Sequence, residues 1–84
     1  MKKNILVVAR RNKTEALRMA AGLVLLDDAV KVALIGDLPE TPEAREQLDT
    51  LEFAEVPIER YGERGIADPA LARAAIAADA VYVV

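Results

Sequence analysis

Residues 5–9 form an apolar run, Ile-Leu-Val-Val-Ala, which no polar residue interrupts. A strand covered on one face alternates apolar and polar side chains, whereas a strand covered on both faces is apolar throughout. The run is therefore typical of a strand inside a parallel sheet with helices on both faces. Residues 30–35 and 80–84 are also mainly apolar and predict two further strands of the same sheet.

Two of the segments between strands carry strong helix start signals. Thr41-Pro42 and Asp68-Pro69 each place a residue that can cap a helix before a proline. Proline fits the first helical position because its missing N–H would have no partner there. The two dipeptides predict helices over residues 42–51 and 69–78.

The first helix is predicted over residues 14–26, with Thr14 as its N-cap. It carries two neighbouring apolar stripes. One consists of Leu17, Ala20, Ala21 and Val24, and the other of Met19, Leu23 and Leu26. Together they leave only a narrow polar edge on the helix. Such a helix is either nearly enclosed in its own domain or partly covered by another subunit, and the small number of elements here favours a subunit contact. Gly22, in the middle of the helix, predicts a close approach of another backbone.

A third strand is expected around residues 56–58. Pro57 cannot donate a hydrogen bond to a neighbouring strand, so this strand is predicted at a sheet edge. The resulting order of elements, β-α-β-α-β-α-β, implies right-handed crossovers. The fold prediction is a single domain over residues 1–84, a three-layer α/β/α structure with a four-stranded parallel sheet in the order 3-2-1-4.

Composition excludes several chemistries. The chain has no cysteine and no histidine, so it has no thiolate nucleophile and no histidine base, and no catalytic residue, metal site or cofactor is predicted. The net charge of −3 and only three aromatic residues argue against nucleic-acid binding. The apolar run at the N-terminus is too short for a signal peptide and no run reaches membrane-spanning length, so a cytoplasmic protein without membrane contact is expected.

Ligands of open α/β sheets bind at the carboxyl ends of the strands. There, Arg10, Arg11, Lys13 and Thr14 lie before the first predicted helix, whose N-terminal N–H groups favour an anion. The loop contains no glycine, so it matches neither the Walker pattern nor the dinucleotide fingerprint. The residues form either an anion site or a solvated basic loop.

The second loop at this end is residues 60–66, which contains two glycines and two arginines. On composition alone it is an ordinary turn. Catalysis by paired carboxylates is a third hypothesis, and its candidate residues near these loops are Asp37, Glu40, Glu59, Glu63 and Asp68. Acidic residues are common in loops and at helix starts, however, and Asp68 is interpreted as a cap.

The pattern as a whole resembles the DsrE/DsrF-like family of small sulfur-relay proteins. The resemblance extends over nearly the full chain and is carried by residues 5–8, 15–23, 27–37, 64–66 and 78–84. The resemblance implies a three-layer α/β/α fold and assembly into homo- or hetero-oligomers of related subunits. In catalytic members it also implies a persulfide-carrying cysteine after the third strand, shortly before an Arg-Gly pair.

In this chain the loop that replaces the family cysteine contains Arg60, Tyr61, Gly62 and Arg64, and no thiol is present. A persulfide requires a thiolate. The leading hypothesis is therefore a non-catalytic DsrE-like protein that forms oligomers or serves as a partner subunit. The alternative is a small anion- or nucleotide-binding module that uses the loop after the first strand.

Overall fold

A computed structural model describes residues 3–84. Its helices and strands, in chain order, are β1 (Asn4–Ala9), α1 (Lys13–Leu25), β2 (Ala29–Ile35), α2 (Pro42–Phe53), β3 (Ile58–Tyr61), the short 3₁₀ helix η1 (Gly65–Ala67), α3 (Pro69–Ala77) and β4 (Ala80–Val83).

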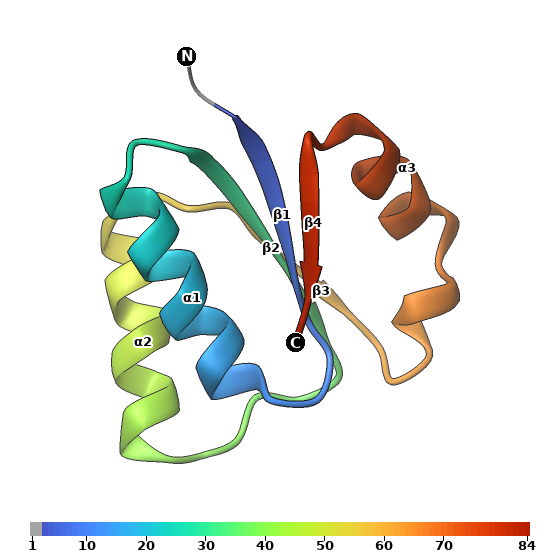
Figure 1. Cartoon of the computed structure of the whole chain (residues 1–84). Coiled ribbons are helices and arrows are strands. Elements are labelled where there is room, and N and C mark those ends of the chain that lie inside the picture. The colour runs from blue at the N-terminus through green and yellow to red at the C-terminus, as the bar shows by residue number, and fades with distance from the viewer. Residues whose placement is uncertain (1–2) are drawn as a thin grey trace.

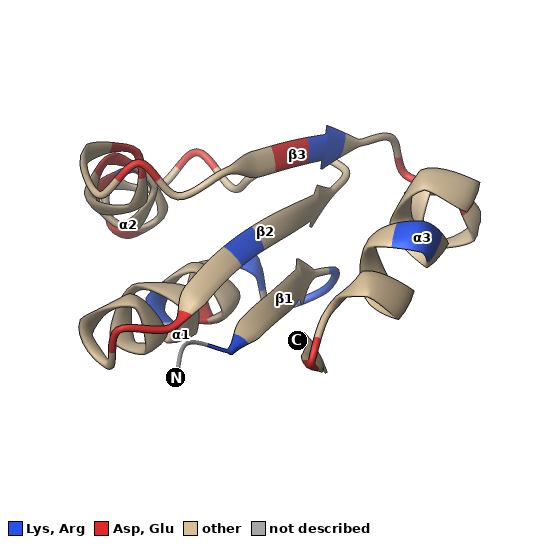
Figure 2. Cartoon of the chain, turned by 90° about the horizontal axis from the view of Figure 1, so that it is seen from above, with Lys and Arg blue, Asp and Glu red and all other residues tan. Residues whose placement is uncertain are grey.

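The four strands form one parallel sheet in the order β3-β2-β1-β4. α1 and α2 lie against one face of the sheet, and α3 lies against the other (Figures 1 and 2). The predicted α/β/α layers and the predicted strand order are both confirmed. The order also places β3 and β4 at the two edges.

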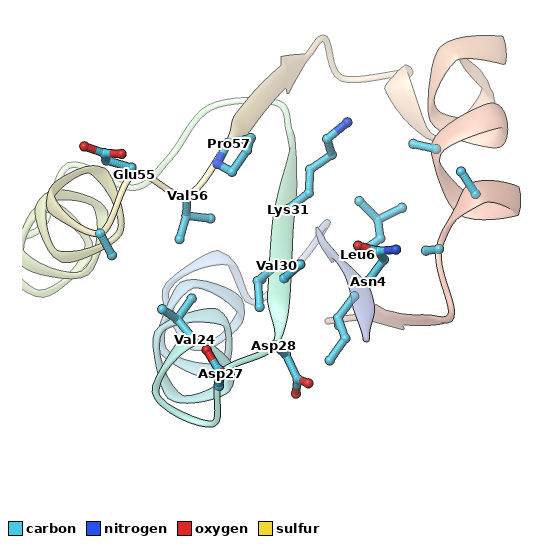
Figure 3. Close-up of a pocket in the computed structure, with 16 residues that line it drawn as sticks. Asn4, Leu6, Val24, Asp27, Asp28, Val30, Lys31, Glu55, Val56 and Pro57 are labelled. Carbon is cyan, nitrogen blue, oxygen red and sulfur yellow. The ribbon is translucent and has the colours of Figure 1, made fainter. Parts of the chain in front are cut away.

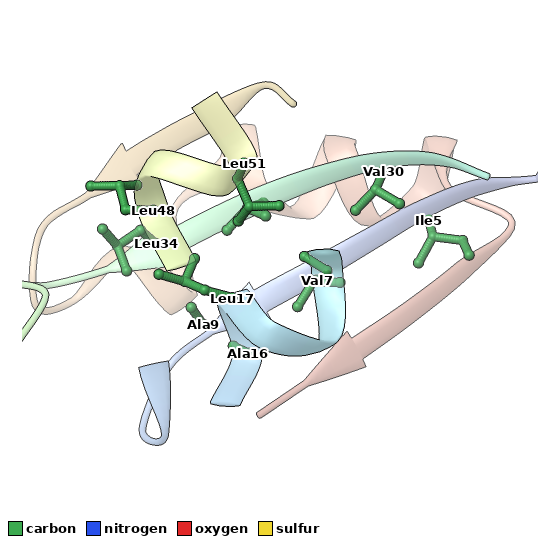
Figure 4. Close-up of a cluster of buried hydrophobic side chains, with 11 residues drawn as sticks. Ile5, Val7, Ala9, Ala16, Leu17, Val30, Leu34, Leu48 and Leu51 are labelled. Atoms are coloured by element: carbon green, nitrogen blue, oxygen red, sulfur yellow. The ribbon is translucent and has the colours of Figure 1, made fainter. Parts of the chain in front are cut away.

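The larger core lies between the sheet and the α1–α2 layer. Val7 and Leu34 point to this face and are completely buried against Leu17 of α1 and Leu51 of α2 (Figure 4). Val32 belongs to the same cluster and is also completely buried. Alternate residues of the same strands point to the opposite face. The central strands are therefore apolar at consecutive positions, as the uninterrupted run in β1 predicts.

The smaller core lies under α3. Leu6, Val8 and Ile35 are buried there together with Leu71, which is the buried anchor of α3. One helix of nine residues covers this face, compared with two longer helices on the other face. The α3 face therefore contributes less buried apolar surface.

The caps predicted for α2 and α3 are confirmed. Thr41 Oγ1 accepts a hydrogen bond from Ala44 N at 3.1 Å, and Asp68 Oδ1 accepts one from Ala70 N at 2.8 Å. In both helices the proline occupies the first turn.

The cap predicted for α1 is wrong. The helix begins at Lys13, so Thr14 lies inside the first turn, and Asn12 is the residue before the helix. Ala16 N donates to Asn12 O at 3.0 Å, which makes the Asn12 carbonyl the first acceptor of the helix. No side chain caps this end of α1.

The third strand also differs from the prediction, because it spans Ile58–Tyr61 and not residues 56–58. Val56 N donates to Leu51 O at 3.0 Å, so its N–H is used by the turn that follows α2. Pro57 has no N–H to donate, and its carbonyl accepts from Val32 N at 2.9 Å. Pairing with β2 therefore starts at the proline carbonyl, and β3 follows at the predicted sheet edge.

The residues of the two predicted apolar stripes of α1 are only partly buried. Ala16, Leu17 and Ala20 are buried, whereas Leu25 at the end of the helix is 86% exposed and the following Leu26 is 72% exposed. The close backbone approach predicted at Gly22 is wrong, since a Cβ built at this position meets no atom within 4 Å. Gly22 is an exposed helical glycine with no packing role.

We therefore expect Gly22→Ala to raise the free energy of unfolding by about 1 kcal/mol, because alanine restricts the unfolded chain and favours the helix. Urea unfolding followed by circular dichroism measures the change. Gly65→Ala is the matched control and should destabilise the fold, because a Cβ at Gly65 would collide with the Cβ of Tyr61. A destabilised Gly22→Ala variant would contradict this assignment.

Candidate functional site

At the carboxyl ends of the strands, the basic loop after β1 is tied to the end of the sheet. The backbone N–H groups of Arg10 and Arg11 both donate to Val84 O at 3.0 Å. Arg10 and Arg11 are exposed and lie in the loop between β1 and α1. Two backbone N–H groups that could have bound an anion thus already donate to a carbonyl at the end of β4.

The other two residues of the predicted anion site are used differently. Lys13 Nζ donates to the backbone oxygen of Asp37 at 2.9 Å, which links the start of α1 to the loop after β2. Thr14 is half-buried within the first turn of α1. The structure therefore brings Arg10, Arg11 and the helix start together but turns Lys13 toward the neighbouring loop.

The four residues predicted to replace the family cysteine do not share one loop. Arg60 and Tyr61 belong to β3, while Gly62 and Arg64 follow it, with Arg64 directly before η1. The prediction of a continuous loop is wrong because β3 begins two residues later than expected and so extends through Tyr61. Tyr61 O accepts from Gly36 N at 2.9 Å, which fixes the end of β3 beside the end of β2.

Glu59 makes a polar cluster that sequence reasoning missed. Its carboxylate forms an ion pair with Lys31 Nζ at 2.8 Å and accepts a hydrogen bond from the Tyr61 hydroxyl at 2.7 Å. The hydrogen bond from Lys31, followed by that from Tyr61, lowers the pKa of Glu59, and the bond to Glu59 raises the pKa of Tyr61 to about 12. The cluster could not be predicted because the register between β2 and β3, which places Lys31 beside Glu59, is not evident from the sequence.

These two pKa shifts argue against acid–base catalysis at the cluster. A general base or acid works best when its pKa lies near the working pH. Here the shifts move both groups away from neutral pH, so Glu59 is held ionised and Tyr61 is held protonated. The cluster is a set of charge-assisted hydrogen bonds that joins β2 to the edge strand β3.

An open hollow of about 610 Å³ lies at the opposite end of the sheet, near the start of β1 and β2 (Figure 3). Val24, Val30 and Val56 contribute apolar surface to it, and Asp27 and Asp28 contribute acidic groups. Ligand sites of open α/β sheets lie at the carboxyl ends of the strands. The hollow lies at the amino ends and contains none of the predicted site residues, so its volume alone does not mark an active site.

The two edges of the sheet differ sharply. β3 follows a proline and carries Glu59 and Arg60, and Glu59 is paired with Lys31. Proline and charged residues are the features that protect an exposed edge strand from pairing with another chain. The β3 edge therefore has features that disfavour pairing with another chain.

The β4 edge carries none of these features. Its residues Val81, Tyr82 and Val83 are uncharged and are 40%, 43% and 57% exposed. In β1, which pairs with β4, no residue of the run 5–9 is more than 5% exposed. Within residues 3–84, β4 is thus an apolar strand with β1 as its one neighbour.

The backbone of β4 also offers free hydrogen-bonding groups. Val84 N donates to Val8 O, and Val84 O accepts from Arg10 N, each at 3.0 Å, so Val84 faces β1. The backbone groups of successive strand residues point to opposite sides. The N–H and C=O groups of Val81 and Val83 therefore point away from β1, toward the open edge.

Other kinds of site are not formed by the described residues. Among residues 3–84, no group of three or more Asp, Glu, Cys or His side chains is arranged to hold a metal ion. In the same part of the chain, no helix has both the length and the apolar character needed to cross a membrane.

Comparisons with protein-family models, with curated proteins and with solved structures found no match to this chain. Function is therefore inferred from the residues and from their geometry.

The Glu59 cluster predicts a pH-dependent contribution to stability. The pKa of Glu59 is lower in the folded protein than its ordinary value of 4.5. The stabilisation by this carboxylate is therefore fully present above pH 4.5 and is lost as the pH falls through the pKa of the folded state. Glu59→Gln should lower the free energy of unfolding at neutral pH, and the difference from wild type should shrink in acid. Urea unfolding at several pH values measures it, with Glu46→Gln on the exposed side of α2 as control. A difference independent of pH would contradict the prediction.

Proposed function

We propose that this protein is a non-catalytic interaction subunit whose β4 edge binds another protein chain by strand addition. The observation that carries the proposal is the β4 edge, where three apolar side chains are 40–57% exposed beside free backbone groups. Strand addition satisfies such groups with main-chain hydrogen bonds, and pockets for alternate side chains provide specificity. Each of the three side chains would gain about 1 kcal/mol on full burial.

The contrast within one sheet supports the proposal. The β3 edge is guarded by proline and charge, which shows that this fold can carry edge protection, while β4 has only apolar residues between Asp79 and its end. An exposed apolar edge without such protection favours association with another chain. The exposed residues Leu25 and Leu26 at the end of α1 offer a second, smaller apolar surface.

The pathway is a further part of the proposal. The resemblance to the DsrE/DsrF-like family, together with the absence of cysteine, suggests a partner subunit related to sulfur-relay proteins. A subunit of this kind would contribute binding surface and no persulfide, because the chain has no thiol.

The anion-binding alternative has less support. In its favour, the start of α1 lacks a side-chain cap and lies beside two exposed arginines. Against it, Lys13 donates to Asp37 O, and the N–H groups of Arg10 and Arg11 donate to Val84 O. We therefore retain it as the second candidate only.

The matched pair Val83→Pro and Val83→Thr tests the proposal. Proline at 83 removes an N–H that points to the open edge and leaves the bonds to β1 intact, whereas threonine keeps the N–H and the branched shape. We expect the wild-type chain and Val83→Thr to associate with a protein chain, their own or another, and Val83→Pro to bind at least tenfold more weakly. Sedimentation velocity and affinity capture with each variant measure this.

Circular dichroism confirms that both variants fold. Association that is equally strong in Val83→Pro would contradict the proposal, and so would a wild-type chain that binds neither itself nor any other protein. If association were lost only when Leu25 and Leu26 are replaced by serine, the α1 end and not the β4 edge would be the contact surface.

A further inference from the structure

The proposed function leaves open which chain occupies the β4 edge. Resting on that proposal, we infer that the occupant is the β4 strand of a second copy of this chain, paired antiparallel about a twofold axis at Tyr82. The inference depends on the backbone alternation of β4, on the charges at the two ends of the edge and on the state of the other edge.

The backbone of β4 fits its own copy. Val81 and Val83 present their N–H and C=O groups to the open edge, as Val84 faces β1. In an antiparallel pair, directly opposed residues whose groups face the partner exchange two hydrogen bonds. Val81 of each copy then pairs with Val83 of the other, and the outward backbone groups of both residues are satisfied.

This register places Tyr82 opposite Tyr82 of the second copy. Tyr82 is 43% exposed and pairs in register with Val7, which points to the α1–α2 face. Residues at such a non-hydrogen-bonded position approach closely, and aromatic cross-strand pairs are favourable there. The side chain that is most exposed on that face of β4 thus meets its own copy.

The ends of the edge carry opposite charges. Asp79 lies directly before β4, is exposed, and accepts a hydrogen bond from Asn4 N through Oδ2 at 2.8 Å. Arg10 and Arg11 are held beside the far end of the strand by their bonds to Val84 O. Antiparallel pairing brings Asp79 of each copy to the same end of the interface as the two arginines of the other, whereas parallel pairing would bring like charges to the same end. The edge is therefore complementary to itself in one orientation only.

Pairing of this kind closes the assembly. A twofold interface uses the same surface of both chains, so each copy covers the exposed β4 edge of the other. The outer edges of the resulting continuous sheet are then the two β3 strands, which Pro57, Glu59 and Arg60 protect from further strand addition. A dimer, and not an open fibre, is the expected product.

Single cysteines test the pairing directly, because the chain contains none of its own. In a glutathione redox buffer, Tyr82→Cys should form a disulfide with itself, since the two Cα atoms lie about 4.5 Å apart in this register. Val81→Cys and Val83→Cys should each fail to cross-link alone and should cross-link when mixed. Mass spectrometry of the products identifies the linked residues.

A linkage of Val81→Cys with itself would overturn the inference in favour of a parallel pair or of an antiparallel pair in another register. No linkage at any of the three positions would overturn it entirely. Charge reversal provides an independent arm that changes no residue of β4, and rescue by mixing separates the charge effect from the loss of the bond between Asp79 and Asn4 N. Asp79→Lys should weaken the dimer severalfold at low salt, and mixing it with the Arg10→Glu/Arg11→Glu variant should restore the affinity. No loss or no restoration would overturn the charge argument.

Failure of this inference and failure of the proposed function give different results. If the chain is monomeric at every concentration while Val83→Pro, but not Val83→Thr, loses another protein partner, self-pairing is wrong and the interaction function stands. If Val83→Pro changes no association at all, the interaction function is wrong, and self-pairing falls with it.

Discussion

The burial of β1 on both faces and along both sides is the constraint on which the rest of the structure depends. Residues 5–9 are at most 5% exposed, and β1 pairs with β2 on one side and with β4 on the other. An apolar strand of this kind can be accommodated only in the middle of a sheet that has helices on both faces. The positions of α1 and α2 on one face and α3 on the other follow from it.

The same constraint explains why the two sides of the sheet are unlike. On one side, β2 leads to β3, whose proline and charged residues are suited to a free edge. On the other side, β4 continues the apolar character of the centre although it has one neighbour only. We interpret β4 as a strand with the composition of an interior strand at an edge position, and the proposed function and the proposed dimer both follow from this mismatch.

Much of the fold could be predicted because it depends on local signals. Apolar runs define the central strands, and Thr41 and Asp68 define helix starts through a hydroxyl or carboxylate next to a proline. The errors arose where the outcome depends on neighbours. Thr14 has the chemistry of a cap, but the bonds between the Arg10–Arg11 amides and Val84 set where the turn after β1 ends and the helix begins.

The candidate site was less predictable than the fold for the same reason. The exposure of the β4 side chains depends on the strand order, and the Glu59 cluster depends on the register between β2 and β3, which places Lys31 within reach. The prediction of a close backbone approach at Gly22 was wrong because the presence of glycine in a helix does not by itself show that another segment packs against it. In this chain, periodicity predicts which faces are buried, and only the assembled sheet shows which edge is left open.

The most direct measurement of the central claim is residue-resolved hydrogen exchange of the β4 amides as a function of protein concentration. The Tyr82 amide faces β1 and should be protected at every concentration, whereas the Val81 and Val83 amides face the open edge. We expect the Val81 and Val83 amides to exchange rapidly in dilute solution and to become protected as the chain associates. Rapid exchange at both residues in the fully associated protein would contradict pairing at the β4 edge.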